Sequence, residues 1–219
     1  MCVQLKIEQI MTRDVISLSP ADSIQSAIQI MRDSEIRHLP LTDDHNQLIG
    51  LVTERDIKMA TPILLDKEKV KEITSMPLSS IMKKELITGH PLDFVEEAAV
   101  LFYDYKIGCL PIIQQNRLVG IITGTDLLHT MVELTGAHKP GSQIEIKVAN
   151  RSGKLHEITT VLKKLNTNIL SVLIYPDSAD DDSQIIVLRV ATMNPQRVIE
   201  QLQTDGLEVI WPQLPRMGL

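Results

Sequence analysis

Apolar positions along this chain follow helical and strand-like periods. The same order of predicted helices and strands occurs twice before position 133. Each copy has an amphipathic helix, marked by apolar residues at helical spacing: Ile24, Ala27, Ile28 and Met31, then Val95, Ala98, Ala99 and Phe102. Each copy also has two apolar strands, predicted at 36–41 and 48–52, then at 107–113 and 118–122. A short strand is expected before each helix, at 15–18 and 86–88.

The starts of these helices are predicted from proline and aspartate. Ser19-Pro20-Ala21-Asp22 places proline at the first helical position with a carboxylate close behind, and His90-Pro91-Leu92-Asp93 keeps both features. Both helices are therefore expected to begin at the proline.

The two copies share a seven-residue frame. Residues 50–56 read glycine, two aliphatic residues, threonine, two variable residues and aspartate, and the same frame returns at 120–126. Ile10-Met11 likewise corresponds to Ile81-Met82, which extends the repeat upstream. The sequence therefore predicts a duplicated unit, with a second helix in each copy beginning at Thr-x-x-Asp. Residues 60–79 connect the copies and are expected to be partly helical.

The pattern changes after residue 131. Residues 134–141 are rich in glycine and proline, as expected of a linker. Strands are then predicted at 144–148, 169–175, 184–190 and 207–211, with a helix after the first and another after the third. This βαββαβ order is the ferredoxin-like arrangement. The loop at 176–182, with its three aspartates, is predicted to be a solvated hairpin.

These patterns define an α+β fold built from α/β repeats. The expected organisation is a first repeat at 1–61, a connector at 62–79, a second repeat at 80–133, a linker at 134–141 and a C-terminal domain at 142–219.

Composition excludes several classes of protein. A net charge of −6 argues against a nucleic-acid partner, which would require a basic surface. Residues 1–8 lack the apolar core of a signal peptide, and no apolar run is long enough to span a membrane. Two cysteines, Cys2 and Cys109, do not make a disulfide framework. We therefore expect a cytoplasmic protein with reduced cysteines.

The paired threonine and aspartate residues have two readings. As a capping box, Thr53 with Asp56 and Thr123 with Asp126 would only satisfy free N–H groups of a helix start. Alternatively, a helix start at the end of an apolar strand suits a phosphate, and the carboxylate beside it suits a pair of sugar hydroxyls. A small anionic ligand with a ribose meets both conditions.

Enzyme motifs are missing from the sequence. His156-Glu157 lacks the second histidine of a zinc protease motif, and neither a phosphate-binding loop nor a nucleophile elbow occurs. Cysteine and histidine do not cluster at metal-ligand spacing. We expect no catalytic residues and no metal site.

The duplicated frame resembles a tandem pair of CBS (cystathionine β-synthase) domains, and the C-terminal segment resembles an ACT domain. This order is similar to that of acetoin-utilisation proteins. The similarity is strongest in four stretches: Met82-Lys83-Lys84, residues 90–97, Ile107-Gly108-Cys109-Leu110-Pro111, and residues 141–148.

The resemblance implies a pseudo-twofold pair of clefts that bind an adenine nucleotide or a related adenosyl compound. In one cleft, Thr123 and Asp126 would face residues of the first repeat: Val15, Ile16, Ser17, Arg37, His38, Leu39 and Pro40. In the other, Thr53 and Asp56 would face Leu86, Ile87, Thr88, Gly108, Cys109, Leu110 and Pro111. Because Arg37 and His38 would belong to the Asp126 cleft, that cleft is expected to be the better nucleotide site.

The ACT resemblance implies an amino-acid site at the turn Asn150-Arg151-Ser152-Gly153. The candidate ligand residues are Asn150, Ser152 and Gly153, with Asn168 at the start of the next strand. Serine stands where the family pattern has proline, and a domain that serves only for dimerisation is the alternative.

Together these features favour a non-enzymatic regulatory protein that senses adenylate state and acts on a protein partner in acetoin or butanediol catabolism. A homodimer is expected from the resemblance. The alternatives are a dimerising scaffold without a small ligand and an enzyme of acetoin breakdown.

Overall fold

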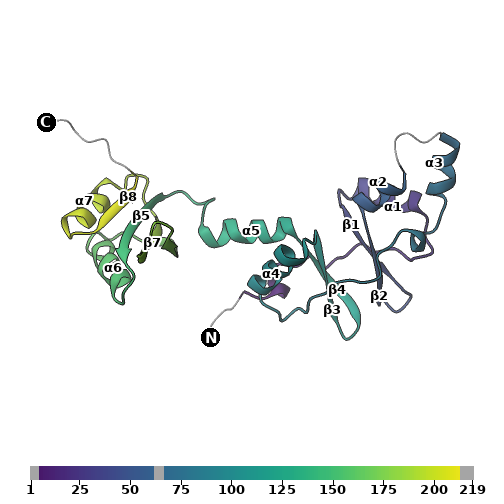
Figure 1. The fold of residues 1–219 in the computed structure, drawn as a ribbon, viewed down its shortest axis with the longest axis horizontal. Coiled ribbons are helices and arrows are strands. Elements are labelled where there is room, and N and C mark those ends of the chain that lie inside the picture. Colours follow the sequence, from purple (N-terminus) through teal and green to yellow (C-terminus); the bar gives the residue numbers. More distant parts are fainter. Residues whose placement is uncertain (1–4, 62–66, 213–219) are drawn as a thin grey trace. The chain divides into compact units, whose positions relative to one another are not determined.

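The computed structural model describes residues 5–61 and 67–212, and the chain forms two compact units (Figure 1). The first unit runs from Met1 to Leu128 and the second from His129 to Leu219. The division falls within helix α5 (Gly124–Thr135). Cys2 lies outside the described residues, so only Cys109 has a described environment.

The first unit contains the duplicated pattern as two antiparallel hairpins and their helices. Its elements before α5 are η1 (Ile7–Gln9), α1 (Ile24–Asp33), β1 (His38–Thr42), β2 (Leu48–Thr53), α2 (Glu54–Ala60), α3 (Lys67–Thr74), η2 (Leu78–Ser80), α4 (Val95–Tyr105), β3 (Cys109–Gln114) and β4 (Arg117–Thr123). The predicted hairpins, the helices that follow them and the partial helix in the connector are confirmed.

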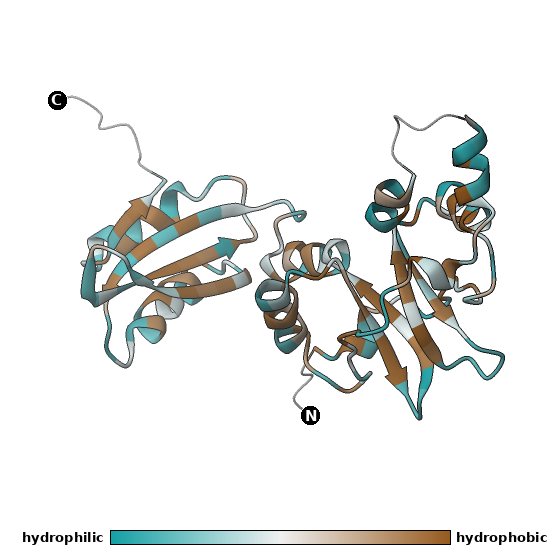
Figure 2. Ribbon diagram, turned by 45° about the vertical axis from the view of Figure 1, so that its right-hand side comes forward, coloured by the Kyte–Doolittle hydropathy of each residue, from teal (hydrophilic) through white to brown (hydrophobic). Residues whose placement is uncertain are grey.

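The two hairpins have the same register. His38 pairs with Thr53 in the first, and Cys109 pairs with Thr123 in the second. The residues that open each hairpin therefore lie beside the threonine that ends it. Hydrophobic residues dominate the strands of both hairpins (Figure 2).

Each repeat's opening segment completes the core of the other repeat. Ile7 in η1 is fully buried and packs with Ala98 of α4, while Leu78 in η2 is fully buried and packs with Ala27 of α1. Burial of such a side chain stabilises a fold by about 1.5–3 kcal/mol. The two repeats are therefore one folding unit, which their sequence boundaries did not indicate.

Backbone hydrogen bonds fix this exchange on both sides. Thr12 and Ile121 exchange N–H···O bonds of 3.0 Å, and Leu51 and Lys83 exchange bonds of 3.0 and 2.9 Å. The glycine of each repeated frame lies at these crossings. A Cβ atom at Gly120 would be 2.5 Å from Met11 Sδ, and one at Gly50 would be 2.8 Å from Met82 Sδ. The repeated glycine is thus required by close packing against the repeated methionine.

Two local predictions were wrong. The segments at 15–18 and 86–88 are not strands, and single bridges form at Leu18 with Leu41 and at Gly89 with Ile112 instead. The first helix begins at Ile24, not at Pro20, with Ser23 as its N-cap. The carboxylate of Asp22 accepts a 2.7 Å hydrogen bond from the Ser19 N–H, which closes a turn before the helix.

The helix of the second repeat begins late for the same reason. The carboxylate of Asp93 accepts a 2.6 Å bond from the His90 N–H, and α4 starts at Val95. In both repeats the acid that follows the proline serves a turn and leaves the helix start to later residues.

The second unit has the predicted βαββαβ order. After α5 its elements are β5 (Ser142–Ala149), α6 (Lys154–Lys164), β6 (Ile169–Asp177), β7 (Asp180–Val190), α7 (Gln196–Thr204) and β8 (Glu208–Trp211). The strands form one antiparallel sheet in the order β6-β7-β5-β8. Buried aliphatic residues of β5 and β7, including Ile146 and Leu188, pack with Ile158 of α6 and Ile199 of α7.

The aspartate-rich segment is mostly strand. Only Ser178 and Ala179 lie between β6 and β7, so the hairpin is tighter than predicted. Lys147 of β5 lies 2.7 Å from Asp177 and 3.3 Å from Asp180, and these ion pairs raise the pKa of the lysine. The acids thus have a structural partner at the end of the sheet.

Candidate functional site

The repeated threonine and aspartate residues form matching helix starts. Asp56 accepts bonds of 2.9 Å from the Thr53 N–H and 2.6 Å from its hydroxyl, and Thr53 caps α2. Asp126 accepts bonds of 2.7 Å from the N–H and the hydroxyl of Thr123. The capping interaction therefore exists in both repeats. Whether these residues also bind a ligand depends on the clefts beside them.

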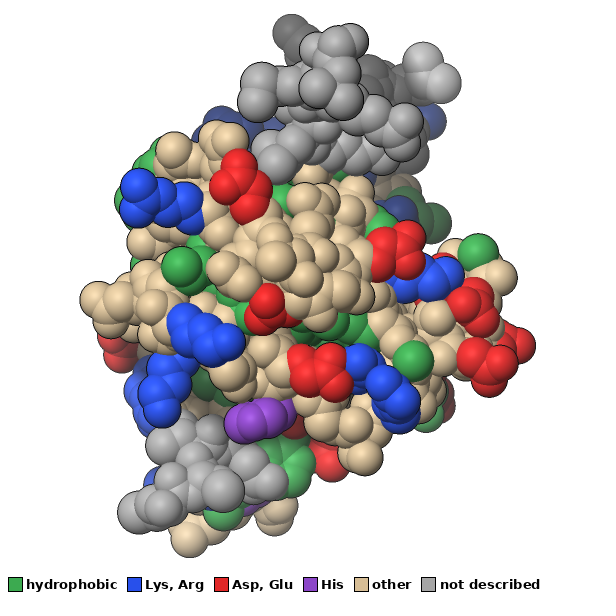
Figure 3. Space-filling model, turned by 90° about the vertical axis from the view of Figure 1, so that its left-hand side faces the viewer, with side chains coloured by type: hydrophobic (Ala, Val, Ile, Leu, Met, Phe, Trp, Pro, Cys, Tyr) green, Lys and Arg blue, Asp and Glu red, His purple; other side chains and the backbone are tan. Residues whose placement is uncertain are grey.

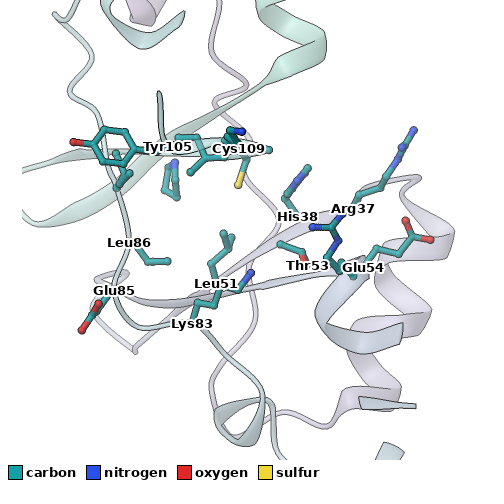
Figure 4. Close-up of a pocket in the computed structure, with 16 residues that line it drawn as sticks. Arg37, His38, Leu51, Thr53, Glu54, Lys83, Glu85, Leu86, Tyr105 and Cys109 are labelled. Atoms are coloured by element: carbon teal, nitrogen blue, oxygen red, sulfur yellow. The ribbon is translucent and has the colours of Figure 1, made fainter. Parts of the chain in front are cut away.

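The Asp56 cleft lies beside the first of these turns and measures about 660 Å³. Figure 4 shows Arg37, His38, Thr53 and Glu54 on one side and Glu85, Leu86 and Tyr105 on the other. Its other lining residues include Leu51, Arg55, Lys83, Ile87, Lys106, Gly108, Cys109 and Pro111. Small-molecule sites in proteins usually measure about 300–1,000 Å³, so the cleft is large enough for a nucleotide.

The Asp126 cleft lies beside the second turn and measures about 650 Å³. It is lined by Thr12, Asp14, Val15, Ile16, Glu35, Ile36, Arg37, His38, Gly108, Ile121, Thr123, Gly124, Thr125 and Asp126. In each cleft the threonine turn of one repeat faces the opening segment of the other. The family resemblance implies a pairing of the same kind.

An apolar cluster lies between the hairpins. Leu51, Cys109 and Ile121 are buried there, and Val15 and Leu86 pack against them. Leu51 and Leu86 line the Asp56 cleft, while Val15 and Ile121 line the Asp126 cleft. Each cleft thus has an apolar wall suited to a planar base next to a polar turn.

Arg37 and His38 line both clefts, so their expected assignment to the Asp126 cleft alone was wrong. The reason lies at Gly108, where a Cβ atom would be 2.5 Å from His38 Nε2. The imidazole occupies the space left by this glycine. Burial, followed by the nearby Arg37 charge, lowers the pKa of His38, which favours the neutral ring.

Lys83 is a charged group of the Asp56 cleft that the sequence reasoning did not single out. Its Nζ lies 3.1 Å from Asp56 Oδ1, and the Asp56 side chain is only 12% exposed. Burial alone would raise the pKa of Asp56, but hydrogen bonds from Thr53 and Lys83 lower it overall. Aligning the two repeats gives a signal for this residue. Lys83 follows Met82 where the neutral Thr12 follows Met11, so the charge at this position differs between the repeats.

Some predicted cleft residues lie in the core instead. Leu39 and Leu110 are fully buried in the cores of the two repeats, because successive strand residues point to opposite faces. Ser17 bonds Thr42 at 3.1 Å. Six predicted residues are not among those lining the two clefts: Ser17, Leu39, Pro40, Asp56, Thr88 and Leu110.

Cys109 is 3% exposed, and burial raises the pKa of its thiol to about 12. At neutral pH it is a protonated, apolar wall residue. A reactive thiolate is therefore not expected there.

The candidate amino-acid residues of the second unit do not lie together. Asn150, Ser152 and Gly153 follow the end of β5, whereas Asn168 precedes β6. Both strands are antiparallel to β7, so they are parallel to each other, and α6 returns the chain to the end where β5 began. Asn168 consequently lies at the opposite end of the sheet from the other three residues.

The described residues offer neither a metal cluster nor a membrane-spanning helix. Within residues 5–61 and 67–212, no three acidic, histidine or cysteine side chains gather in a way that could hold a metal ion. The same residues contain no helix both long and apolar enough to cross a bilayer. On the face shown in Figure 3, basic and acidic side chains are interspersed and do not form a basic stripe.

Comparison with known proteins identifies the duplicated region. The family model described as "CBS domain" matches residues 7–62 and 78–133, just over half of the chain. Inosine-5'-monophosphate dehydrogenase of Methanocaldococcus jannaschii is 33% identical over 124 residues, which cover 56% of this chain and 23% of that protein. The chain thus spans about a quarter of the length of that relative.

Two solved structures are similar to part of this chain. A putative acetoin utilization protein (AcuB) from Vibrio cholerae is 30% identical, with a TM-score of 0.54 over 63% of this chain and 100% of that one. The CBS domain pair of protein MJ0100, in complex with 5'-methylthioadenosine and S-adenosyl-L-methionine, is 26% identical. Its TM-score is 0.52 over 62% of this chain and 99% of that one.

Proposed function

The chain belongs to the CBS domain family, and we propose on this basis that it is a non-catalytic regulatory protein whose clefts bind adenosyl ligands. The observation that carries the proposal is the pair of matching clefts. Each combines a threonine–aspartate helix start with an apolar wall and about 650 Å³ of space or more. A capping box alone would need neither the wall nor the space.

The chemistry of each cleft suits a nucleoside. We expect the Asp126 carboxylate, which lines its cleft, to accept hydrogen bonds from the paired ribose hydroxyls. In the other cleft Thr53 lines the wall, while Asp56 lies behind it and pairs with Lys83. Leu86 and Val15 provide apolar surface for the base, and Arg37, which lines both clefts, provides a cation for an anionic group. The relative MJ0100, whose structure holds 5'-methylthioadenosine and S-adenosylmethionine, supports ligands of this class.

Thermal unfolding of the full chain tests the proposal. At a concentration of 100 times Kd, AMP or 5'-methylthioadenosine should stabilise the protein by about 2.7 kcal/mol, because ligand binds the folded state. Uridine monophosphate is the control, since it shares the ribose and phosphate but lacks adenine. If none of the adenosyl compounds raises the unfolding temperature, the dimerising scaffold becomes the better account.

The biological setting is a further part of the proposal. Similarity to the Vibrio cholerae protein supports a role in acetoin or butanediol catabolism. We infer that this role is exerted in the cytoplasm on a protein partner. The βαββαβ second unit is compatible with an ACT domain that dimerises the chain or binds an amino acid. Sedimentation of the full chain tests the homodimer, and conversion of acetoin by the purified protein would instead favour an enzyme.

A further inference from the structure

We propose that the two clefts divide adenosyl ligands by charge: the Asp56 cleft takes an adenosine 5'-phosphate, and the Asp126 cleft takes an adenosyl compound with a neutral or cationic 5' substituent. This inference rests on the proposed function. It reverses the expectation that the Asp126 cleft is the better nucleotide site, which depended on Arg37 lying in that cleft alone.

The repeat allows the clefts to be compared at matched positions. Lys106 ends α4 in a left-handed conformation (φ 52°), and Glu35 follows α1 with the same conformation (φ 53°). Each directly precedes the isoleucine that leads into a hairpin. Lys106 lines the Asp56 cleft and Glu35 lines the Asp126 cleft. The same structural position thus carries opposite charges in the two clefts.

Two further matched positions differ in the same direction. Arg55 precedes Asp56 where Thr125 precedes Asp126, and Lys83 follows Met82 where Thr12 follows Met11. Arg55 and Lys83 line the Asp56 cleft, and their neutral counterparts line the other. The Asp56 cleft therefore gains a positive charge at each of these positions.

The acidic groups do not cancel this difference. Glu54 lines the Asp56 cleft, but it pairs with Lys58 at 2.6 Å, and its counterpart is Gly124. Glu85 and Asp14 occupy matched positions, so both clefts have one such acid.

The shared residues do not distinguish the clefts. Arg37 lines both, and so does His38, whose ring is held in its neutral form by burial. Lys83 also pairs with Asp56, which offsets the charge of that carboxylate beside a phosphate. The remaining difference favours an anion in the Asp56 cleft and a neutral or cationic group in the Asp126 cleft.

Titration calorimetry of the full chain tests the division with three probes. AMP carries the phosphate, S-adenosylmethionine carries a sulfonium, and 5'-methylthioadenosine is uncharged. The wild type should bind AMP and 5'-methylthioadenosine together, so saturation with one leaves the stoichiometry of the other unchanged. AMP affinity should fall with added salt, whereas 5'-methylthioadenosine affinity should not.

Charge reversal at the matched positions gives paired variants with the same backbone conformation. Lys106→Glu should weaken AMP binding about tenfold and leave S-adenosylmethionine unchanged. Glu35→Lys should weaken S-adenosylmethionine about tenfold and leave 5'-methylthioadenosine unchanged. Both side chains are exposed, and melting of the unliganded variants checks that they fold.

The outcomes separate the two proposals. If the wild type binds none of the probes, the proposed function and this inference both fail. If the probes bind but compete for one cleft, or if both variants affect AMP and S-adenosylmethionine alike, the division by charge fails and the sensor function stands.

Discussion

At the scale of single residues, one repeated glycine allows the two repeats to cross. A Cβ atom at Gly120 would be 2.5 Å from Met11 Sδ and 3.3 Å from the Thr12 carbonyl oxygen. Gly120→Ala should therefore lower the free energy of unfolding by about 1–3 kcal/mol, as overpacked cores do. Urea unfolding monitored by circular dichroism measures the change.

Gly124 provides the matched control in the same strand-to-helix connection. A Cβ atom there has no neighbour within 4 Å, and the residue begins α5. Gly124→Ala should leave stability unchanged or raise it by up to about 1 kcal/mol, because alanine loses less backbone entropy. Equal losses in the two variants would contradict the crossing contact.

The acidic cap of α2 gives a pH-dependent prediction. Burial opposes the charge of Asp56, yet bonds from Thr53 and Lys83 lower its pKa below the ordinary value. A lowered pKa stabilises the folded state above the unfolded pKa, about 3.9, and this contribution is lost as the pH falls through the folded pKa. Asp56→Ala should therefore cost about 1 kcal/mol at pH 7 and less below pH 4.

Unfolding of the wild type and Asp56→Ala by denaturant at a series of pH values measures this. A difference between the two proteins that stays constant down to the acid end would show that the charge of Asp56 does not contribute to the cap.

Only those candidate site residues that occupy the same position in both repeats could be predicted from the sequence. Thr53, Asp56 and their counterparts were recognisable because the frame is repeated. The shared position of His38 was not, because it depends on the space at Gly108 that the imidazole fills. Such contacts join different hairpins, and periodicity does not report them.

At the scale of helices and strands, the exchanged opening segments are the main feature. Leu78 belongs to η2 of the second repeat but is fully buried with Ile24 and Ala27 of the first. Leu78→Ala should destabilise the first unit by about 2–5 kcal/mol. Met59 is 73% exposed, so Met59→Ala should change stability by less than about 0.5 kcal/mol.

Thermal and urea unfolding of both variants provide the comparison. If Leu78→Ala were as stable as Met59→Ala, η2 would not be part of the first repeat's core.

The start of α1 is a second element-scale test. Ser23 accepts a 3.1 Å bond from the Ser26 N–H at the N-cap, whereas Ser19 accepts a longer bond of 3.3 Å from Ala21. Ser23→Ala should cost about 1 kcal/mol, and Ser19→Ala should cost less. Urea unfolding measures both losses of stability. A larger loss for Ser19→Ala than for Ser23→Ala would indicate that the helix begins at Pro20.

Most element types were predictable from periodicity, with the exception of the strands expected at 15–18 and 86–88, and most boundaries fell close to those observed. The helix starts were misplaced because proline followed by aspartate suits both a helix cap and a turn. Only the carboxylate contacts of Asp22 and Asp93 decide between these two structures. The exchange of η1 and η2 was also beyond sequence patterning, since a short apolar segment does not specify its partner.

For the whole molecule, the duplicated unit and the βαββαβ unit followed from the sequence, because repeats and element order need no tertiary contact to be recognised. Ligand choice depends on charges contributed by both repeats to each cleft. The opposite charges of Lys106 and Glu35 bear on ligand choice only because the fold places these residues at matched positions in different clefts.

A crystal structure of the full chain grown with 5'-methylthioadenosine and AMP would show most directly whether these clefts hold a nucleoside. We predict adenosyl density in the clefts, with ribose hydroxyls within hydrogen-bond distance of the Asp126 carboxylate and the base against Val15 or Leu86. Clefts that hold only solvent at saturating ligand would contradict the proposed function and leave the threonine–aspartate pairs as helix caps.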